Sequence, residues 1–89
     1  MPFQLTIVTP ERPLVDTEVD SVIVPGQEGE FGVLPAHEPF LAAIAAGVVR
    51  YTSNGTSSEL KVGGGFAEVG LDRVTVLAQS AEAGSDSDG

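Results

Sequence analysis

The sequence has 89 residues, which is the length of one domain at most. Its formal net charge is −9, and this balance argues against nucleic-acid binding and against a direct hold on anionic lipid, because both depend on Lys and Arg. The chain has no cysteine, which excludes disulfides and cysteine-zinc sites. An acidic surface suits a partner that presents arginine or lysine, although it also serves simply to keep a protein in solution.

The two ends of the chain predict a soluble, cytosolic protein with a short tail. Residues 1–5 lack the basic start and the apolar run of a signal peptide. The longest apolar stretch, residues 40–49, is shorter than the roughly 20 residues that a membrane-spanning helix needs. We expect a folded domain over residues 1–82 and a disordered acidic tail over residues 83–89, because the tail is small and polar.

Apolar and polar residues alternate with a period of two, which is typical of half-buried strands. The alternation covers residues 3–7, 19–24, 59–62 and 74–78. Asn54-Gly55 predicts a tight hairpin between residues 48–52 and 57–62, because both residues tolerate positive φ. Several short strands at this spacing predict an all-β fold, a small two-sheet β-sandwich of short antiparallel strands without a C-terminal helical hairpin.

Two glycine clusters and one alanine-rich segment interrupt the alternating pattern. The glycines in two clusters are interpreted as turns, bulges or close backbone approaches, because neither cluster is followed by the helix of a phosphate or dinucleotide loop; they are Gly26, Gly29 and Gly32, and Gly64 with Gly65. Residues 40–46 are rich in alanine but lie between Pro39 and Gly47. We interpret them as a short buried strand or a single helical turn.

The chain is poor in catalytic equipment. His37 is its one histidine, and no Gly-x-Ser-x-Gly elbow presents a serine beside it. Glu28, Glu30 and Glu38 are close in sequence but do not follow the calcium-loop spacing. These residues favour a binding or structural role without cofactor or metal. Two alternatives remain open: a sandwich that binds calcium or sugar, and a hydrolase centred on His37.

One long run points to a family. Residues 26–41, GQEGEFGVLPAHEPFL, resemble the signature of the epsilon subunit of F-type ATP synthase, a G-E-x-G-[IV]-x-P-x-H-x-P core. Ile44 and Gly47 continue the resemblance, as do residues 64–69 and 74–78. The likeness extends from Phe3 to about residue 82, and the fixed spacing of its central run makes it specific.

The resemblance implies a non-catalytic rotor subunit of the central stalk, within a hetero-oligomeric ATP synthase. Its partners would be the gamma subunit and the c-ring, and it would couple proton flow to ATP synthesis from the cytoplasmic side of the bacterial plasma membrane, without a lipid anchor of its own. The c-ring-facing positions implied by the resemblance are Glu28, Gly29, Glu30 and Phe31. The implied gamma-facing positions are Pro35, His37, Pro39 and Ala42.

The sequence departs from the longer family form at its end. In that form two helices follow the sandwich, and in many members they inhibit ATP hydrolysis. No such helices follow the last strand here, so we expect little or no self-inhibition of ATP hydrolysis.

Overall fold

The alternation of apolar and polar residues produces strands throughout the described part of the protein. The computed structural model describes residues 2–83, and every regular element in this range is a β-strand. The strands are β1 Phe3–Val8, β2 Pro13–Val19, β3 Ser21–Gly26, β4 Gly29–Val33, β5 Phe40–Ser53, β6 Thr56–Val69, β7 Arg73–Ala78 and β8 Ala81–Ala83.

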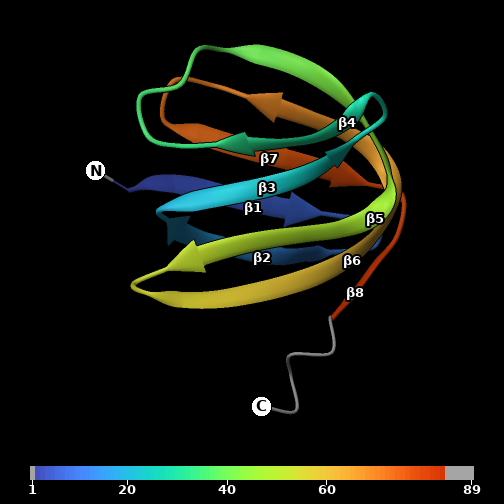
Figure 1. Ribbon diagram of the computed structural model, residues 1–89. Helices are drawn as coiled ribbons and strands as arrows, with labels where there is room; N and C mark the ends of the chain where they lie inside the picture. Colours follow the sequence, from blue (N-terminus) through green and yellow to red (C-terminus); the bar gives the residue numbers. More distant parts are fainter. Residues whose placement is uncertain (1, 84–89) are drawn as a thin grey trace.

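The strands form one hydrogen-bonded ribbon that folds over itself into the two layers of a sandwich (Figure 1). Their order is β2-β1-β7-β6-β5-β3-β4, and β8 pairs with β6 beside this path. All pairs are antiparallel except β1 with β7, which are parallel from Gln4↔Arg73 to Val8↔Leu77. The all-β sandwich expected from the sequence is confirmed, with this one parallel pair as an addition.

The two long strands β5 and β6 make the corner of the sandwich. Each has 14 residues, and both curve around one side of the molecule (Figure 1). Along β5 the buried side chains change from even to odd positions between Ile44 and Val49. Along β6 they change from even to odd positions between Val62 and Ala67. The two strands therefore stay paired while the face that covers the core changes.

Glycines allow the bend in β6. Gly64 and Gly65 have φ values of 110° and 144°, a region that L side chains rarely adopt. A Cβ on Gly65 would overlap the carbonyl oxygen of Leu77 on β7. Gly65 therefore lies at a close backbone approach between β6 and β7.

The core lies between the layers and is wholly apolar among residues 2–83. Strands β1 to β7 all contribute buried side chains, and β2 contributes only Val19 at its end. Five partly buried residues pack against this core: Leu14, Val15, Phe31, Tyr51 and Ala81. The fully buried side chains of largest volume are Leu5, Ile7, Ile44, Val19, Val22, Val24, Val49, Val69, Val74 and Val76. Valine and isoleucine dominate because β-branched side chains pack well on a pleated surface.

The predicted Asn54-Gly55 hairpin is confirmed. Ser53 pairs with Thr56, and the two turn residues have φ values of 53° and 82°. The backbone N–H of Asn54 also donates to Oδ2 of Asp20 at 3.1 Å, and the Ser53 hydroxyl donates to the carbonyl oxygen of Glu18 at 2.7 Å. The hairpin is therefore tied to the corner between β2 and β3.

Two expectations about extent need adjustment. Residues 40–46 form a strand and not a helical turn, but the strand is neither short nor buried: it is the first half of the 14-residue β5, where only Ile44 is buried while Phe40 and Leu41 are exposed. Ala83 is the last residue of β8 and pairs with Leu60, so strand structure extends one residue into the range assigned to the tail. The remainder of that range, residues 84–89, lies outside the described residues.

Candidate functional site

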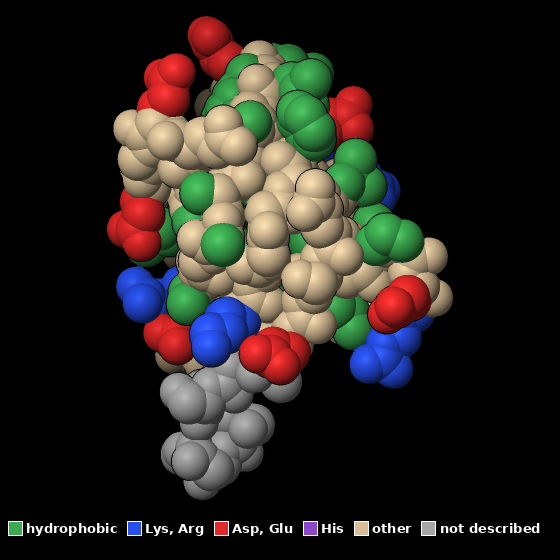
Figure 2. All heavy atoms as spheres, turned by 90° about the vertical axis from the view of Figure 1, so that its right-hand side faces the viewer, with side chains coloured by type: hydrophobic (Ala, Val, Ile, Leu, Met, Phe, Trp, Pro, Cys, Tyr) green, Lys and Arg blue, Asp and Glu red, His purple; other side chains and the backbone are tan. Residues whose placement is uncertain are grey.

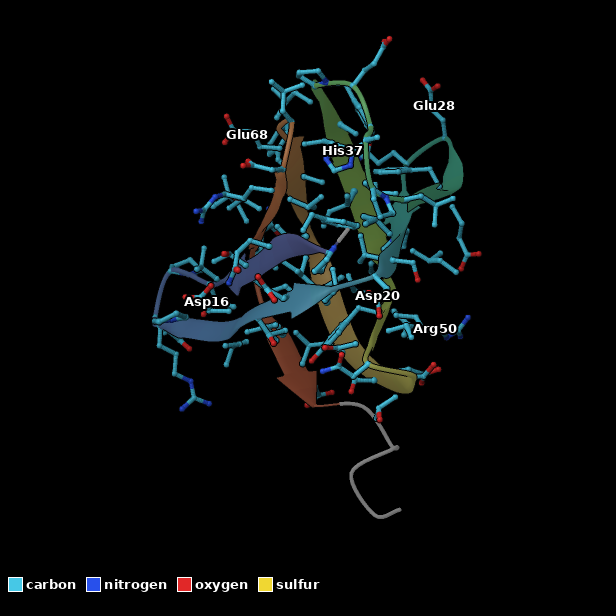
Figure 3. The ribbon with its side chains drawn as sticks, turned by 90° about the vertical axis from the view of Figure 1, so that its left-hand side faces the viewer. Asp16, Asp20, Glu28, His37, Arg50 and Glu68 are labelled. Atoms are coloured by element: carbon cyan, nitrogen blue, oxygen red, sulfur yellow. The ribbon has the colours of Figure 1, made fainter. Side chains whose placement is uncertain are left out.

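The acidic residues Glu28 and Glu30 lie on a tight hairpin between β3 and β4. Gly26 pairs with Gly29, so Gln27 and Glu28 form the turn between them. Glu28, Gly29 and Glu30 are exposed, and Phe31 is half-buried. Figure 3 shows Glu28 at the outer end of this hairpin, pointing away from the sandwich. The structure therefore brings the four predicted c-ring-facing residues together on one projection.

Two glycines and one hydrogen bond hold this turn in place. A Cβ on Gly26 would lie 2.7 Å from the carbonyl oxygen of Gly29 and 3.0 Å from the Phe31 ring, and Gly29 has a φ of 128°. The N–H of Gln27 donates to the carbonyl oxygen of Ala43 on β5 at 3.0 Å. The Phe31 ring meets the Phe40 ring edge to face, with centroids 5.4 Å apart. The carboxylates thus project from a turn that is anchored to β5.

Neither carboxylate of the turn is neutralised within the described part of the chain. The ion pair found among the described residues lies elsewhere: it joins Arg50 on β5 to Glu59 on β6, with 2.8 Å between Nε and Oε2. Glu28 and Glu30 form no such pair among residues 2–83. Their charge is therefore available to a basic partner.

His37 lies in the connection from β4 to β5 and is anchored at both sides of its ring. Its Nδ1 lies 2.7 Å from the carbonyl oxygen of Leu34, and because a carbonyl only accepts, Nδ1 carries the proton. The ring packs edge to face against Phe3, with centroids 5.1 Å apart. Nε2 is buried and has no hydrogen-bond partner within the described residues. Ala36, directly before His37, has a positive φ of 66° and lies in the bend of this connection.

The structure separates the predicted gamma-facing residues into two places. Pro35, His37 and Pro39 share the connection that follows β4, whereas the acidic turn precedes β4 (Figure 3). Ala42 lies with the acidic turn, since it lines the same hollow as Glu28. The predicted set therefore occupies both ends of β4 rather than one continuous surface.

The sequence reasoning did not single out the apolar residues on the outer face of the sandwich. Phe66 and Leu77 are about half exposed, with relative accessibilities of 53% and 46%. The signal was present in the alternation, because both occupy positions that carry polar residues elsewhere in their strands. On β7 the other outward-facing positions hold Arg73 and Thr75, and on β6 the next outward-facing position after Phe66 holds Glu68.

The same part of the chain bears on metal binding and on membrane insertion. Residues 2–83 bring no three His, Asp or Glu side chains close enough to hold a metal ion. They also include no helix with the length and apolar character required to cross a membrane.

Comparison with known proteins relates this geometry to a family. Residues 2–84 match the family described as the ATP synthase Delta/Epsilon chain, beta-sandwich domain. The chain is 54% identical over 86 residues to an ATP synthase epsilon chain of Nitratidesulfovibrio vulgaris strain DP4, covering 97% of this chain and 64% of that protein. It is 44% identical to the ATP synthase epsilon chain of Carboxydothermus hydrogenoformans, with the same coverage. This chain therefore spans about two thirds of the length of these relatives, 64% in both cases.

Solved structures show the same fold. A chain of the Euglena gracilis mitochondrial ATP synthase, in a structure of OSCP, F1 and c-ring, superposes with a TM-score of 0.86 at 26% identity, covering 92% of this chain and 53% of that one. A chain from the Tetrahymena thermophila mitochondrial ATP synthase, from a structure of central stalk and c-ring, superposes with a TM-score of 0.76 over 90% of this chain and 65% of that one; at 10% identity this likeness concerns the fold alone. On the strength of the match over residues 2–84 and these relatives, the chain belongs to the delta/epsilon chain family of ATP synthase.

Proposed function

We propose that the protein is a non-catalytic rotor part of a proton-translocating ATP synthase, which binds the gamma subunit and the c-ring. One observation carries this proposal: β4 joins two anchored projections, the acidic turn before it and the His37 connection after it. A coupling part has to hold two partners at once, and a short rigid strand between two contact regions suits that task. The two epsilon chains of 54% and 44% identity named above are bacterial, which supports a place at the cytoplasmic face of the plasma membrane.

The two projections are expected to contribute differently. An exposed carboxylate–arginine pair stabilises a complex by only about 0–1 kcal/mol. Buried apolar surface contributes roughly 25 cal/mol per Å², so a modest apolar contact outweighs several such pairs. We therefore assign affinity to apolar contact with gamma, and the orientation on the c-ring to Glu28 and Glu30.

A titration against the gamma subunit of the same synthase tests this division. We expect saturable one-to-one binding that persists at high salt, because screening weakens exposed charge pairs far more than apolar contact. Glu30→Gln should leave the gamma Kd within about twofold, whereas His37→Ala should weaken it by roughly tenfold, through loss of the ring and its anchoring contacts. Equal losses for both variants would contradict the division of labour, and no binding of the unaltered protein at any salt would contradict the proposal itself.

A second test concerns ATP hydrolysis. We infer that this 89-residue polypeptide inhibits hydrolysis little, because its described residues are all in strands and connections, with no helix to insert into the catalytic head. Added in excess to an assembled head that lacks its own epsilon chain, it should lower the hydrolysis rate by less than about twofold at concentrations where the gamma titration is saturated. A longer epsilon chain with helices is the matched control. Strong, saturable inhibition by the 89-residue chain would contradict the inference.

A further inference from the structure

Asn54 is the one asparagine of the sequence, and Gly55 follows it directly. In such a pair the main-chain nitrogen of the glycine can attack the side-chain amide carbon of the asparagine, because a glycine has no side chain to hinder the approach. Glutamine reacts more slowly in this way, since it would have to close a larger ring. The capacity of the chain for amide loss is therefore concentrated in the turn between β5 and β6.

The tip of this hairpin leaves both reacting groups open to water. Asn54 and Gly55 are exposed, and a Cβ built on Gly55 would meet no described atom within 4 Å. The hydrogen bond that Asn54 forms within residues 2–83 uses its backbone N–H, so its side-chain amide is unpaired there. Exposed loop tips of this kind are also where chains most readily open locally. Neither packing nor a side-chain hydrogen bond therefore protects the Asn54 amide.

Two contacts that anchor the hairpin tip oppose the reaction. The Asn54 N–H donates to Oδ2 of Asp20 at 3.1 Å. The Ser53 hydroxyl donates to the carbonyl oxygen of Glu18 at 2.7 Å. Ring closure requires rotation about the Cα–C bond of Asn54 away from the hairpin geometry, which is a local opening that both hydrogen bonds resist. The negative charge of Asp20 also disfavours the deprotonated Gly55 nitrogen, which is the attacking form.

We propose that Asn54 is a deamidation site, where the asparagine becomes aspartate or isoaspartate, and that the anchoring contacts with Asp20 and Glu18 set the rate. The Gly55 nitrogen forms a bond to Cγ of Asn54, and the Cγ–Nδ2 bond breaks. Nδ2 leaves as ammonia with the proton that Gly55 gives up. Water then opens the resulting succinimide at either of its two C–N bonds, which gives aspartate or isoaspartate. Water is the one co-reactant, and no step depends on the proposed function.

The product places a new carboxylate beside an existing one. Because the Asn54 backbone is hydrogen-bonded to Asp20, a negative charge on the side chain at position 54 is repelled by that carboxylate. The chain has 13 acidic and 4 basic residues, and Figure 2 shows acidic side chains at several points around the face at the β5–β6 corner. A further negative charge therefore adds to a balance that already disfavours the compact state. Isoaspartate also lengthens the main chain inside the turn that sets the pairing of Ser53 with Thr56.

The place of the hairpin determines what the modification changes. Figure 1 shows the β5–β6 hairpin and the β3–β4 turn at opposite sides of the sandwich. In Figure 3, Asp20 lies below both Glu28 and His37. Deamidation should therefore lower the stability of the fold while it leaves the acidic turn and the His37 connection unaltered.

Ageing of the folded protein tests the proposal. The unaltered protein is kept in warm, mildly alkaline buffer and digested with trypsin, which cuts after Arg50 and Lys61 and so releases residues 51–61. We expect this peptide to gain the mass of an amide-to-acid exchange and to separate into aspartate and isoaspartate forms. Asn54→Gly is the matched control and should show no gain, since Gly-Gly also suits the turn but has no amide to lose. If the free peptide 51–61 lost its amide while the folded protein kept it, the proposal would be overturned.

Removal of an anchoring contact tests what sets the rate. Asp20→Ala should speed the conversion by roughly 3–10-fold, because a hydrogen bond to a charged acceptor no longer resists opening of the tip. If this variant unfolds in circular dichroism, Ser53→Ala takes its place and should speed the conversion by about twofold or more. A rate equal to that of the unaltered protein would overturn the role assigned to the anchoring contacts.

The melting temperature tests the consequence of the new charge. Aged protein and the Asn54→Asp variant should both melt roughly 2–8 °C below fresh protein, the effect of one close pair of like charges in a domain of this size. Asn54→Asp combined with Asp20→Ala should recover part of that loss, because the repelling partner is gone. An unchanged melting temperature in Asn54→Asp would contradict the repulsion between positions 54 and 20.

Discussion

Replacing Gly65 by alanine is expected to remove about 2–6 kcal/mol of stability, which for many domains is a large part of a total of about 5–15 kcal/mol. The residue has a φ of 144°, and its added Cβ would overlap the Leu77 carbonyl oxygen and lie 3.1 Å from Cα of Ala78. The neighbouring backbone has little room to yield, because Gly65 pairs with Ala78 on β7 and with Ile44 on β5. Urea unfolding followed by circular dichroism measures the loss.

Gly55→Ala is the matched control for this substitution. Gly55 also has a positive φ, 82°, but its added Cβ would meet nothing within 4 Å. It should lose only about 1–3 kcal/mol, the cost of backbone strain alone. If the two variants lost equal amounts, the close approach at Gly65 would contribute nothing and the account of the corner would be wrong.

Ile44→Ala is expected to cost about 2–5 kcal/mol, the range for truncating a buried isoleucine. Ile44 is 1% exposed and lies where β5 bends at the corner, and its direct partner on β6 is Gly65, which has no side chain to fill the space. For a domain of this size the melting temperature should fall by about 4–8 °C for each kcal/mol lost. Calorimetry gives both quantities.

Leu41→Ala tests whether burial causes that effect. Leu41 lies three positions earlier in the same strand and is 67% exposed. Its truncation should change the free energy of unfolding by no more than about 0.5 kcal/mol. A comparable loss at both positions would show that the first half of β5 is packed differently from the arrangement described above.

Local rules account for the parts of the fold that the sequence predicted well. The hairpin at Asn54-Gly55 depends on two residues that tolerate positive φ, and the strands depend on alternation that each segment carries by itself. The family resemblance of residues 26–41 also proved sound, since it is a contiguous pattern. In each case the decisive information lies within a few residues of where it acts.

Contacts between distant segments could not be predicted in this way. Residues 40–46 belong to β5 because they pair with residues 63–69 of β6, and the alanines of this segment do not by themselves indicate that partner. The contact of His37 with Phe3 and the position of Ala42 beside the acidic turn depend on the folded path of β4 and β5. The exposed pair Phe66 and Leu77 was missed for the same reason, because the two residues become neighbours only once the register of β6 and β7 is known.

The parallel pairing of β1 with β7 has a consequence for how the protein is made. One neighbour of β1 is β2, which follows it directly in the sequence. The other neighbour is β7, so Gln4 can pair with Arg73 only after almost the whole domain has been synthesised. During synthesis at about 5–20 residues per second, β1 keeps one unpaired edge until nearly the whole domain has left the ribosome. Long sequence separations of this kind slow folding, and an open strand edge is a site of wrong pairing. A nascent chain stalled before β7 would therefore expose the edge that the finished protein covers.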